Sequence, residues 1–467
     1  MKLKDLKVSI SEFWQEFRKV KSGLVGLAIF GFFLALLIFE PVLAPFSETN
    51  TRWRDISYWD DNPQSAYPIW VNFFSAKKYA ESALLENPEV KEEVFGTNRM
   101  VTYTFEYDYQ YDIAPADLIL KVEGSGVAMM DLTFTRPDGE SVLLASSNLN
   151  MAEGGVNRIS VDKGSKSEAY EFLGYFESRD NLRKFQRSSI KPAAILFAKA
   201  QENMLIEPEA LKGKYTMQAA LLLQRPSDIV RDVKLVIPGR VFGLLGTDAF
   251  KRDLFSGVLA GIKWALLIGL LTAVVSVMVG VIYGVISAYL GGWKDSLMQR
   301  IFEIFNSIPL LPVLIVMSAI FKPSIWNLIL IMCIFYWTGS VKTVRSMGLQ
   351  IKEETFIEAT RALGASNFRI IFKHIIPLII PYSFASMALF IPGAIVYEAS
   401  ISLLGLGDAT IVTWGQILRD AYTGGAVING LWWWVIPPGL MIAIMGMSFA
   451  FIGFALDKIL HPKLRTR

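Results

Sequence analysis

Residues 353–377 read EETFIEATRALGASNFRIIFKHIIP, and this stretch decides the fold more than any other part of the sequence. Apolar side chains recur at helical spacing over 356–363, and Gly364 then supplies a natural left-handed end for that helix. Ser366 is placed to cap a second short helix over 367–375, ahead of a long apolar run. The stretch therefore predicts two short amphipathic helices that meet at an angle.

Charged side chains mark the outer faces of these two helices, namely Glu358, Arg361, Arg369 and Lys373. A short amphipathic element of this kind suits insertion into a groove on a partner protein. It equally suits a position flat against lipid headgroups, as an interfacial helix. The residues taken alone leave both interpretations open.

Long apolar runs lie on both sides of this stretch. The hydrocarbon core of a bilayer, about 30 Å thick, requires roughly 20 apolar residues in helical form. By that measure we expect six transmembrane helices, at Gly23–Ala44, Trp264–Tyr289, Ile301–Phe321, Ile325–Val341, Leu378–Leu404 and Leu431–Leu456. The first run is too long for the apolar part of a cleaved signal peptide, so we interpret it as a retained helix.

The composition supports a membrane protein and excludes several other classes. Hydrophobic residues make up 52% of the 467 residues and charged residues only 19%, which is more apolar than ordinary soluble domains. A net charge of +3 gives no basis for nucleic-acid binding. One cysteine and two histidines do not suffice for a zinc site, and neither a phosphate-binding loop nor a nucleophile elbow occurs. We therefore expect no enzyme activity, no bound metal and no cofactor in this chain.

Between about Phe46 and Arg240 the sequence changes character, because no run there is long enough to span a bilayer. Short stretches alternate between apolar and polar residues, as expected of strands with one buried face. These stretches are 101–109, 118–124, 130–135, 214–223 and 230–237. A turn signal lies at 136–139 and a helical patch at 193–202. We expect a mainly α-helical membrane protein with a β-rich, sandwich-like insert that carries helical additions.

The distribution of lysine and arginine predicts the orientation, since short cytoplasmic loops carry an excess of both. The amino-terminal segment, the loop 342–373 and the carboxyl-terminal tail are all basic, and an even number of spans places both termini on one side. That side is expected to be the cytoplasm, with the insert on the extracytoplasmic side of the cell membrane. The expected division is a cytoplasmic segment 1–22, a first helix 23–44, the insert 45–245, a five-helix core 246–456 whose cytoplasmic helices are 353–376, and a cytoplasmic tail 457–467.

The stretch 353–377 also resembles a family signature. Permeases of binding-protein-dependent ABC importers carry a cytoplasmic motif of Glu-Ala-Ala, three residues, Gly, nine residues and Ile-x-Leu-Pro. Here Glu358-Ala359-Thr360 is followed by Gly364 and by His374-Ile375-Ile376-Pro377. Thr360, His374 and Ile376 depart from the motif, but a histidine at that place is typical of the oligopeptide/dipeptide branch.

Further motifs of that branch match this chain. They are Leu245-Gly246-Thr247-Asp248, Arg252-Asp253, Ser256, Gly291-Gly292-Trp293, Asp295, Trp337, Arg345, Phe356, Glu398-Ala399-Ser400, Leu404-Gly405-Leu406-Gly407 and Trp414-Gly415. The resemblance covers 246–467 strongly and 1–44 weakly, and it says nothing about the long insert. One span ahead of a long outer segment is similar to the C-type subunit of the permease pair. The chain departs from the branch at Lys251, at Lys342 and over 453–458.

The resemblance implies a transport subunit for oligopeptides or dipeptides. In such importers two permeases form the pore, two cytoplasmic ATPases bind ATP and Mg²⁺, and an outer solute-binding protein delivers the substrate. By this likeness the ATPase-coupling residues are Glu358, Ala359, Arg361, Gly364, Ala365, Ser366, Arg369, His374 and Pro377. Arg345 is a further candidate for contact with ATPase acids, with a solvated charge as the alternative.

Two polar residues inside the expected spans are candidates for a gate or substrate path. Glu398 lies near the outer end of the fifth span, where a buried acid is costly and usually functional. The alternative is a hydrogen bond from Glu398 to a neighbouring helix or loop. Asn306, near the inner end of the third span, is a weaker candidate.

Other functions stay open at this point. The same machinery importing oligosaccharides is an alternative, because the branch includes sugar transporters and selectivity rests largely with the binding protein. A membrane-anchored extracytoplasmic ligand sensor is more distant, since six proline-interrupted spans and the coupling motif argue against it. The insert is expected to dock the binding protein, to brace the partner permease or to bind ligand itself.

Overall fold

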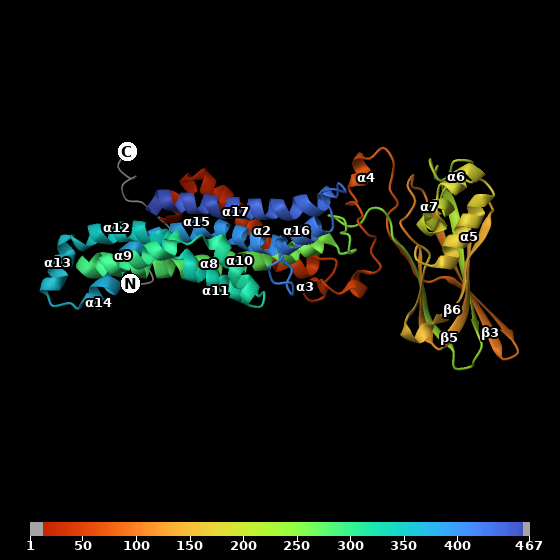
Figure 1. The fold of residues 1–467 in the computed structure, drawn as a ribbon, viewed down its shortest axis with the longest axis horizontal. Coiled ribbons are helices and arrows are strands. Elements are labelled where there is room, and N and C mark those ends of the chain that lie inside the picture. The colour runs from red at the N-terminus through yellow and green to blue at the C-terminus, as the bar shows by residue number, and fades with distance from the viewer. Residues whose placement is uncertain (1–12, 461–467) are drawn as a thin grey trace. The chain divides into compact units, whose positions relative to one another are not determined.

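The computed structural model describes residues 13–460 (Figure 1). The chain forms two compact units: one ends at Arg54 and resumes at Ser256, and the other is Asp55–Phe255. The first unit is helical, and the second is built mainly of strands. The insert was expected over 45–245, so both of its expected ends lie before those of the compact unit Asp55–Phe255. The expected cytoplasmic segments 1–22 and 457–467 extend beyond the described residues.

Helices make up the first unit. They are α2 (Lys21–Leu43), α3 (Thr49–Arg52), α8 (Leu254–Leu290), α9 (Gly292–Ser307), α10 (Leu310–Ile320), α11 (Ile325–Tyr336), α12 (Thr338–Lys352), α13 (Thr355–Ala362), α14 (Asn367–Arg369), the π-helical turn η4 (Ile370–Ile375), α15 (Ile376–Leu403), α16 (Trp414–Thr423) and α17 (Trp432–Leu460). Figure 1 shows α13 and α14 at one end of this unit, with α3 and α16 towards the other end.

Five helical stretches of the described chain are long and apolar enough to cross a membrane, and a sixth span results if α9 and α10 form one bent pair. The five stretches are Lys21–Leu43, Leu254–Leu290, Ile325–Lys352, Asn367–Leu403 and Trp432–Leu460. Each of them contains or overlaps one of the predicted spans. The helical, multi-span character of the protein is therefore confirmed.

The predicted span 301–321 is broken in the structure into two helices. α9 ends at Ser307, α10 begins at Leu310, and their axes bend by 74°. Pro309 explains the break, because proline lacks an amide hydrogen and disfavours a helical conformation in the residue before it. Ile308 accordingly has an extended backbone, with φ −82° and ψ 119°.

Small residues allow the helices of this unit to approach closely. The Ser448 hydroxyl of α17 donates a hydrogen bond to the Gly26 carbonyl of α2 at 2.8 Å. A Cβ atom at Gly26 would lie 2.7 Å from the Ser448 carbonyl oxygen. Glycine is therefore required here by the close contact of two backbones, as is common between membrane helices.

The insert unit contains two antiparallel sheets, with strand orders β1-β9-β4-β7 and β2-β3-β8-β5-β6. The strands are β1 (Ala83–Leu85), β2 (Glu89–Phe95), β3 (Asn98–Tyr109), β4 (Ile119–Ser125), β5 (Val127–Thr135), β6 (Ser141–Asn150), β7 (Gly155–Arg158), β8 (Gly213–Leu223) and β9 (Ile229–Ile237). Buried and exposed residues alternate along β5 and β8. Leu120 of one sheet and Leu132 and Leu221 of the other belong to one hydrophobic cluster. The β-rich insert is therefore a two-layer sandwich.

Short helices complete the insert. They are η1 (Ile56–Trp59), α4 (Val71–Phe74), η2 (Met151–Glu153), α5 (Lys163–Gly174), α6 (Arg179–Arg183), η3 (Arg187–Ser189) and α7 (Pro192–Leu196). The helical patch predicted over 193–202 is too long, because α7 ends at Leu196 and Ala198 then forms a bridge with Ala210. That pairing is tertiary and leaves no mark in the local sequence. α5 was not predicted, although Asp162 caps it by accepting the Ser165 amide.

Candidate functional site

The stretch 353–377 folds as a helix followed by a sharp elbow. α13 ends at Ala362, and Gly364 follows with a left-handed φ of +82°. The Gly364 amide donates to the Arg361 carbonyl at 2.9 Å, and the Ala365 amide donates to the Thr360 carbonyl at 3.3 Å. This pair of bonds is a Schellman ending, which satisfies the last carbonyl groups of the helix. The elbow lies where the glycine predicted it.

The short helix expected over 367–375 is not a separate element. Ser366 caps α14 by accepting the Arg369 amide at 3.3 Å, but α14 continues through η4 into α15, so that the span is Asn367–Leu403. Pro377 lies in the first turn of α15 and has no amide hydrogen for the ordinary helical bond. The wider π-helical turn just before it lets the helix continue past this missing donor.

The inner side of the elbow is anchored in the helical bundle. Ile357 of α13 and Ile370 and Ile375 of η4 are fully buried. They share a hydrophobic cluster with Val285 of α8 and Val344 of α12. Burying one such side chain contributes about 1.5–3 kcal/mol, so three of them fasten the elbow firmly to the spans. The elbow is therefore packed against α8 and α12.

The outer side of the elbow is exposed and chemically mixed. Glu358, Ala359 and Arg361 are exposed on α13. Leu363 is 88% exposed and Phe368 is 69% exposed. We call these five residues the elbow face. Large apolar side chains beside charged groups, held on a rigid base, are typical of a surface that docks another protein.

Tyr289, near the C-terminal end of α8, contacts residues on both sides of the elbow. Its hydroxyl donates to Asn367 Oδ1 at 3.0 Å. The Arg361 guanidinium lies 5.7 Å from the centroid of the Tyr289 ring, within reach of a cation–π contact. Arg361 therefore helps to hold the elbow as well as contributing a charge to its face. Sequence reasoning missed Tyr289, because it lies 78 residues before Asn367.

The remaining predicted coupling residues take different positions around the elbow. Arg369 is exposed on α14, Ala365 is half-buried beside the isoleucine cluster, and His374 is half-buried within η4. Ser366 has a capping role, and Pro377 shapes the start of α15. Their contact with an ATPase stays a prediction.

Arg345 is paired with an acidic residue of its own chain. Its guanidinium makes a bidentate ion pair with Asp295, Nε to Oδ1 at 2.9 Å and an Nη to Oδ2 at 2.5 Å. Asp295 also accepts the hydroxyl hydrogen of Ser287. The pair thus ties α12 to α9 and, through Ser287, to α8. The charge of Arg345 is therefore paired, which contradicts the expected solvated charge, and its contact with ATPase acids stays a prediction.

Glu398 is buried in α15, with 5% of its surface exposed. Its Oε1 atom accepts hydrogen bonds from the hydroxyls of Ser402 and Thr413, each at 2.7 Å. Thr413 in turn caps α16 by accepting the Gln416 amide at 3.2 Å. Glu398 therefore links α15 to the start of α16, and the hydrogen bond to a neighbouring loop expected as one alternative is present.

Glu398 also lines a small cavity together with Lys322, Asn327 and Asp408. Asn306 is exposed near the end of α9 and is not among the residues lining that cavity. The structure therefore does not bring the two predicted path residues together. Their gate or path role stays a prediction.

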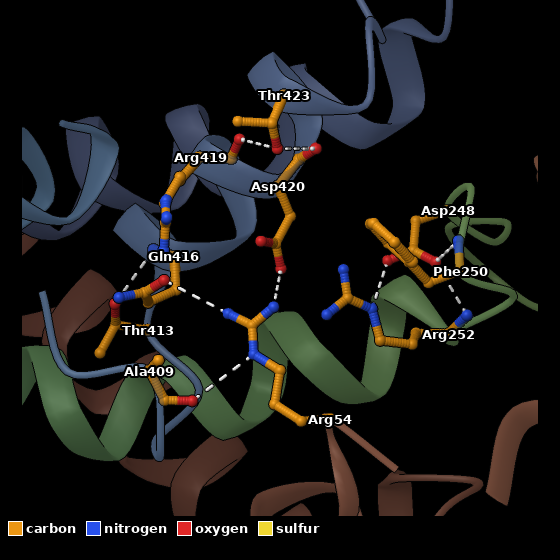
Figure 2. A network of polar contacts seen from close by, with 10 residues as sticks. All are labelled: Arg54, Asp248, Phe250, Arg252, Ala409, Thr413, Gln416, Arg419, Asp420 and Thr423. Atoms are coloured by element: carbon orange, nitrogen blue, oxygen red, sulfur yellow. Dashed lines mark hydrogen bonds and ion pairs between the residues drawn. The ribbon is translucent and has the colours of Figure 1, made fainter. Parts of the chain in front are cut away.

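A second polar network fixes α16, and sequence reasoning missed its centre, Arg54. Figure 2 shows the Arg54 guanidinium donating to Asp420 Oδ2 at 2.8 Å, to Gln416 Oε1 at 3.3 Å and to the Ala409 carbonyl at 3.5 Å. The Trp414 indole of the same helix donates to the Val258 carbonyl of α8 at 2.9 Å. The Trp414-Gly415 motif thus contributes to packing and hydrogen bonding between α16 and α8.

The motif at 245–253 is also structural. Arg252 Nε donates to Asp248 Oδ2 at 2.6 Å, and the Phe250 and Arg252 amides both donate to Asp248 Oδ1 (Figure 2). The Thr247 hydroxyl donates to the Pro63 carbonyl at 2.6 Å. The hydrogen bond between Thr247 and Pro63 holds the C-terminal end of the insert against its N-terminal end. Over residues 13–460, no group of three or more His, Cys, Asp or Glu side chains is placed to hold a metal ion.

Comparison with known proteins places the chain in a family. Residues 276–466 match the profile described as binding-protein-dependent transport system inner membrane component. Residues 10–62 match the N-terminal transmembrane domain of oligopeptide transport permease C. The chain is 34% identical over 221 residues to the dipeptide transport system permease protein of Bacillus subtilis (strain 168), a match that covers 47% of this chain and 68% of that protein. This chain belongs to the oligopeptide/dipeptide permease C family.

A second relative and a solved structure give the extent of the likeness. The chain is 35% identical over 225 residues to the oligopeptide transport system permease protein of Haemophilus influenzae, covering 48% of this chain and 71% of that protein. It is similar to a chain of the MetNI methionine ABC transporter with a TM-score of 0.33 and 20% identity, over 45% of this chain and 97% of that one. The matched family and the two permease relatives make the permease C protein described here a membrane-spanning ABC transport subunit. Its elbow face lies inside the segment 276–466 matched by the family profile.

Proposed function

We propose that this chain is the permease subunit of an ATP-driven importer for oligopeptides or dipeptides. It forms half of the translocation pore with a second permease, and two cytoplasmic ATPase subunits bind ATP and Mg²⁺. The names of the related permeases support the peptide substrate, and the helical spans support the pore. In this proposal the chain binds no cofactor of its own.

The elbow face carries the coupling part of the proposal. Its apolar and charged side chains are exposed, while its isoleucine base is buried against α8 and α12. When the two ATPases close on ATP, a docked elbow moves with them and rocks the attached spans as rigid bodies. In this proposal the elbow passes the movement of the ATPase to the spans, because one side of this short segment contacts the ATPase and the other is packed against the spans.

The orientation follows from the basic short segments. Both termini and the elbow face lie in the cytoplasm, and the insert lies on the extracytoplasmic side, where it meets the solute-binding protein. The substrate path then passes Glu398 near the outer end of α15 and Asn306 near the inner end of the third span. We assign Glu398 to an outer gate, because its buried carboxyl group accepts a hydrogen bond from Thr413, in the connection between α15 and α16.

Charge reversal at Glu358 tests the coupling. Glu358→Lys is expected to leave folding of the spans intact, because Glu358 is exposed. If the ATPase surface that contacts Glu358 is basic, the introduced lysine places a second positive charge against it. Uptake is then expected to fall by about tenfold or more. The measurement is peptide uptake and ATP hydrolysis by the complex, purified from its native membrane and reconstituted in liposomes.

Glu353→Lys is the matched control, since Glu353 is 73% exposed, lies five residues away and makes only a 3.8 Å contact with Lys352. It should leave uptake close to that of the unaltered complex. Normal uptake by the Glu358→Lys complex would contradict docking through the elbow face. Uptake of a labelled dipeptide, measured against competing oligosaccharide in the same liposomes, tests the substrate class separately.

A further inference from the structure

One side of the insert is hollowed into a cleft of about 740 Å³. Its walls come from the loop at 60–65, the end of β7, α5, the segment 188–191 and the return loop at 238–251. All of these residues lie within the single unit Asp55–Phe255. A cleft of this size accommodates a ligand as large as a short peptide.

Basic side chains outnumber acidic ones in this cleft. Its lining holds five basic residues, Arg158, Lys166, Lys191, Arg240 and Lys251, against two acidic ones, Asp60 and Asp117. Such an excess makes the electrostatic potential inside a concave surface positive, because the low-dielectric walls focus the field.

Both acidic groups of the cleft are already committed to two of the five cations. Arg158 pairs with Asp60 at 2.9 Å and with Asp117 at 3.2 Å, and Lys251 pairs with Asp60 at 2.5 Å. Burial alone would raise the pKa of Asp60, but its bonds to Lys251 and Arg158 outweigh burial and hold that pKa below its ordinary value. Asp60 is therefore ionised at neutral pH, and these four side chains neutralise one another.

The other three cations have no acidic partner among the described residues. Lys166 donates only to the Ser188 carbonyl at 3.3 Å, and Arg240 only to the Ala114 carbonyl at 3.3 Å. Lys191 is exposed at the start of α7. Burial lowers the pKa of Arg240, but a guanidinium stays charged in proteins. A partly buried charge without a counter-ion is costly, and an anionic group in the cleft offsets that cost.

The uncharged residues of the cleft lining suit the uncharged part of an organic ligand that carries anionic groups. Pro63, Ala116, Ile190 and Pro238 provide apolar contact, and Ser189 provides a hydroxyl. Carboxylate and phosphate oxygens satisfy lysine and arginine equally well. The apolar part of the surface favours an organic ligand over a bare inorganic ion.

We infer that this cleft binds a short peptide bearing two or more carboxylates, through Lys166, Lys191 and Arg240. The anionic character of the ligand follows from the cleft itself. The choice of a peptide as carrier of the carboxylates rests on the proposed function. The insert then contributes a ligand site of its own, in a part of the chain that lies largely outside the two matched family segments.

The test is calorimetric titration of the purified full-length chain with tri-glutamate, at low ionic strength. Tri-alanine and inorganic phosphate are titrated in parallel. Tri-glutamate is expected to bind, and its affinity is expected to fall as salt screens the cleft. The Lys166→Ala/Lys191→Ala variant should lose about tenfold or more in affinity, since it removes two of the three cations that face the ligand.

Lys214→Ala is the matched control, because Lys214 is already paired with Glu106 at 2.7 Å and is absent from the cleft lining. It should bind tri-glutamate as the unaltered chain does. Absence of tri-glutamate binding, or equal binding by the double variant, would overturn the site. Tighter binding of inorganic phosphate than of tri-glutamate would overturn the peptide assignment. Since no transport is measured, failure here is separate from failure of the importer proposal.

Discussion

Gly364 offers the sharpest test of the elbow, because its replacement changes backbone strain and little else. Its φ is +82°, and a Cβ atom added there would meet nothing within 4 Å. Gly364→Ala therefore creates no clash, and its cost is the left-handed conformation itself, about 1–2 kcal/mol. That energy shifts the balance between this elbow and any alternative by roughly 5- to 30-fold.

The assay is peptide uptake per ATP hydrolysed in the reconstituted complex. Gly364→Ala is expected to lower this ratio, because a displaced elbow presents Leu363 and Phe368 at a different angle. Gly364→Asn should retain most of the coupling, since asparagine tolerates the left-handed region far better than alanine. Both variants add a Cβ atom where Gly364 has none and where nothing lies within 4 Å, so their difference reports how well each residue tolerates the left-handed backbone.

Gly96 supplies the remote control. It has φ +65°, and a Cβ added there also meets nothing within 4 Å, but it lies in the turn between β2 and β3 of the insert. Gly96→Ala therefore introduces a similar strain away from the elbow and should leave coupling unchanged. The reasoning is refuted if Gly364→Ala couples normally, or if Gly364→Asn is impaired as severely as Gly364→Ala.

Three further predictions follow from single contacts. Tyr289→Phe removes the hydrogen bond to Asn367, worth about 0.5–1.5 kcal/mol, while keeping the ring under the guanidinium, so amide exchange in the elbow should accelerate by up to about tenfold by mass spectrometry. Arg345→Lys replaces a bidentate pair to Asp295 by a single contact, and it should lower the thermal stability of the purified chain without altering the elbow face. Glu177 accepts four hydrogen bonds in the insert, which outweigh burial and lower its pKa; Glu177→Gln should cost about 1–3 kcal/mol locally. Because the lowered pKa stabilises the folded insert above the pKa of the unfolded chain, the protection of amides around this residue, corrected for the intrinsic exchange rate at each pH, should fall as pH falls through the acidic range. That protection should respond less to pH in the variant.

Local signals were sufficient for much of the helical unit. Apolar length predicted the five long spans, because a membrane helix must satisfy its backbone within one continuous segment. Gly364 and Ser366 predicted the elbow, since helix endings are set by residues within one turn. The same local reasoning failed over 367–375, because a π-helical turn carries the helix past Pro377 into α15.

Polar residues were harder to interpret from sequence. The stretch around Glu358 was recognisable as a surface motif because its residues are close in the chain. Arg345 was misjudged because its partner, Asp295, lies 50 residues earlier. Arg54 was overlooked because it binds Asp420 across 366 residues. Such pairs have no periodicity or spacing that a single sequence can reveal.

The sequence by itself determined that this chain crosses a membrane several times, that it carries a β-rich insert and that a glycine elbow follows α13. Hydropathy, strand alternation and helix capping are each decided by neighbouring residues. Only the tertiary structure decided that Arg345 and Glu398 are held by internal partners, and that Lys166, Lys191 and Arg240 share one cleft without acidic partners among the described residues. The physical reason is that pairing and neutralisation of charge depend on which distant segments the fold brings into contact.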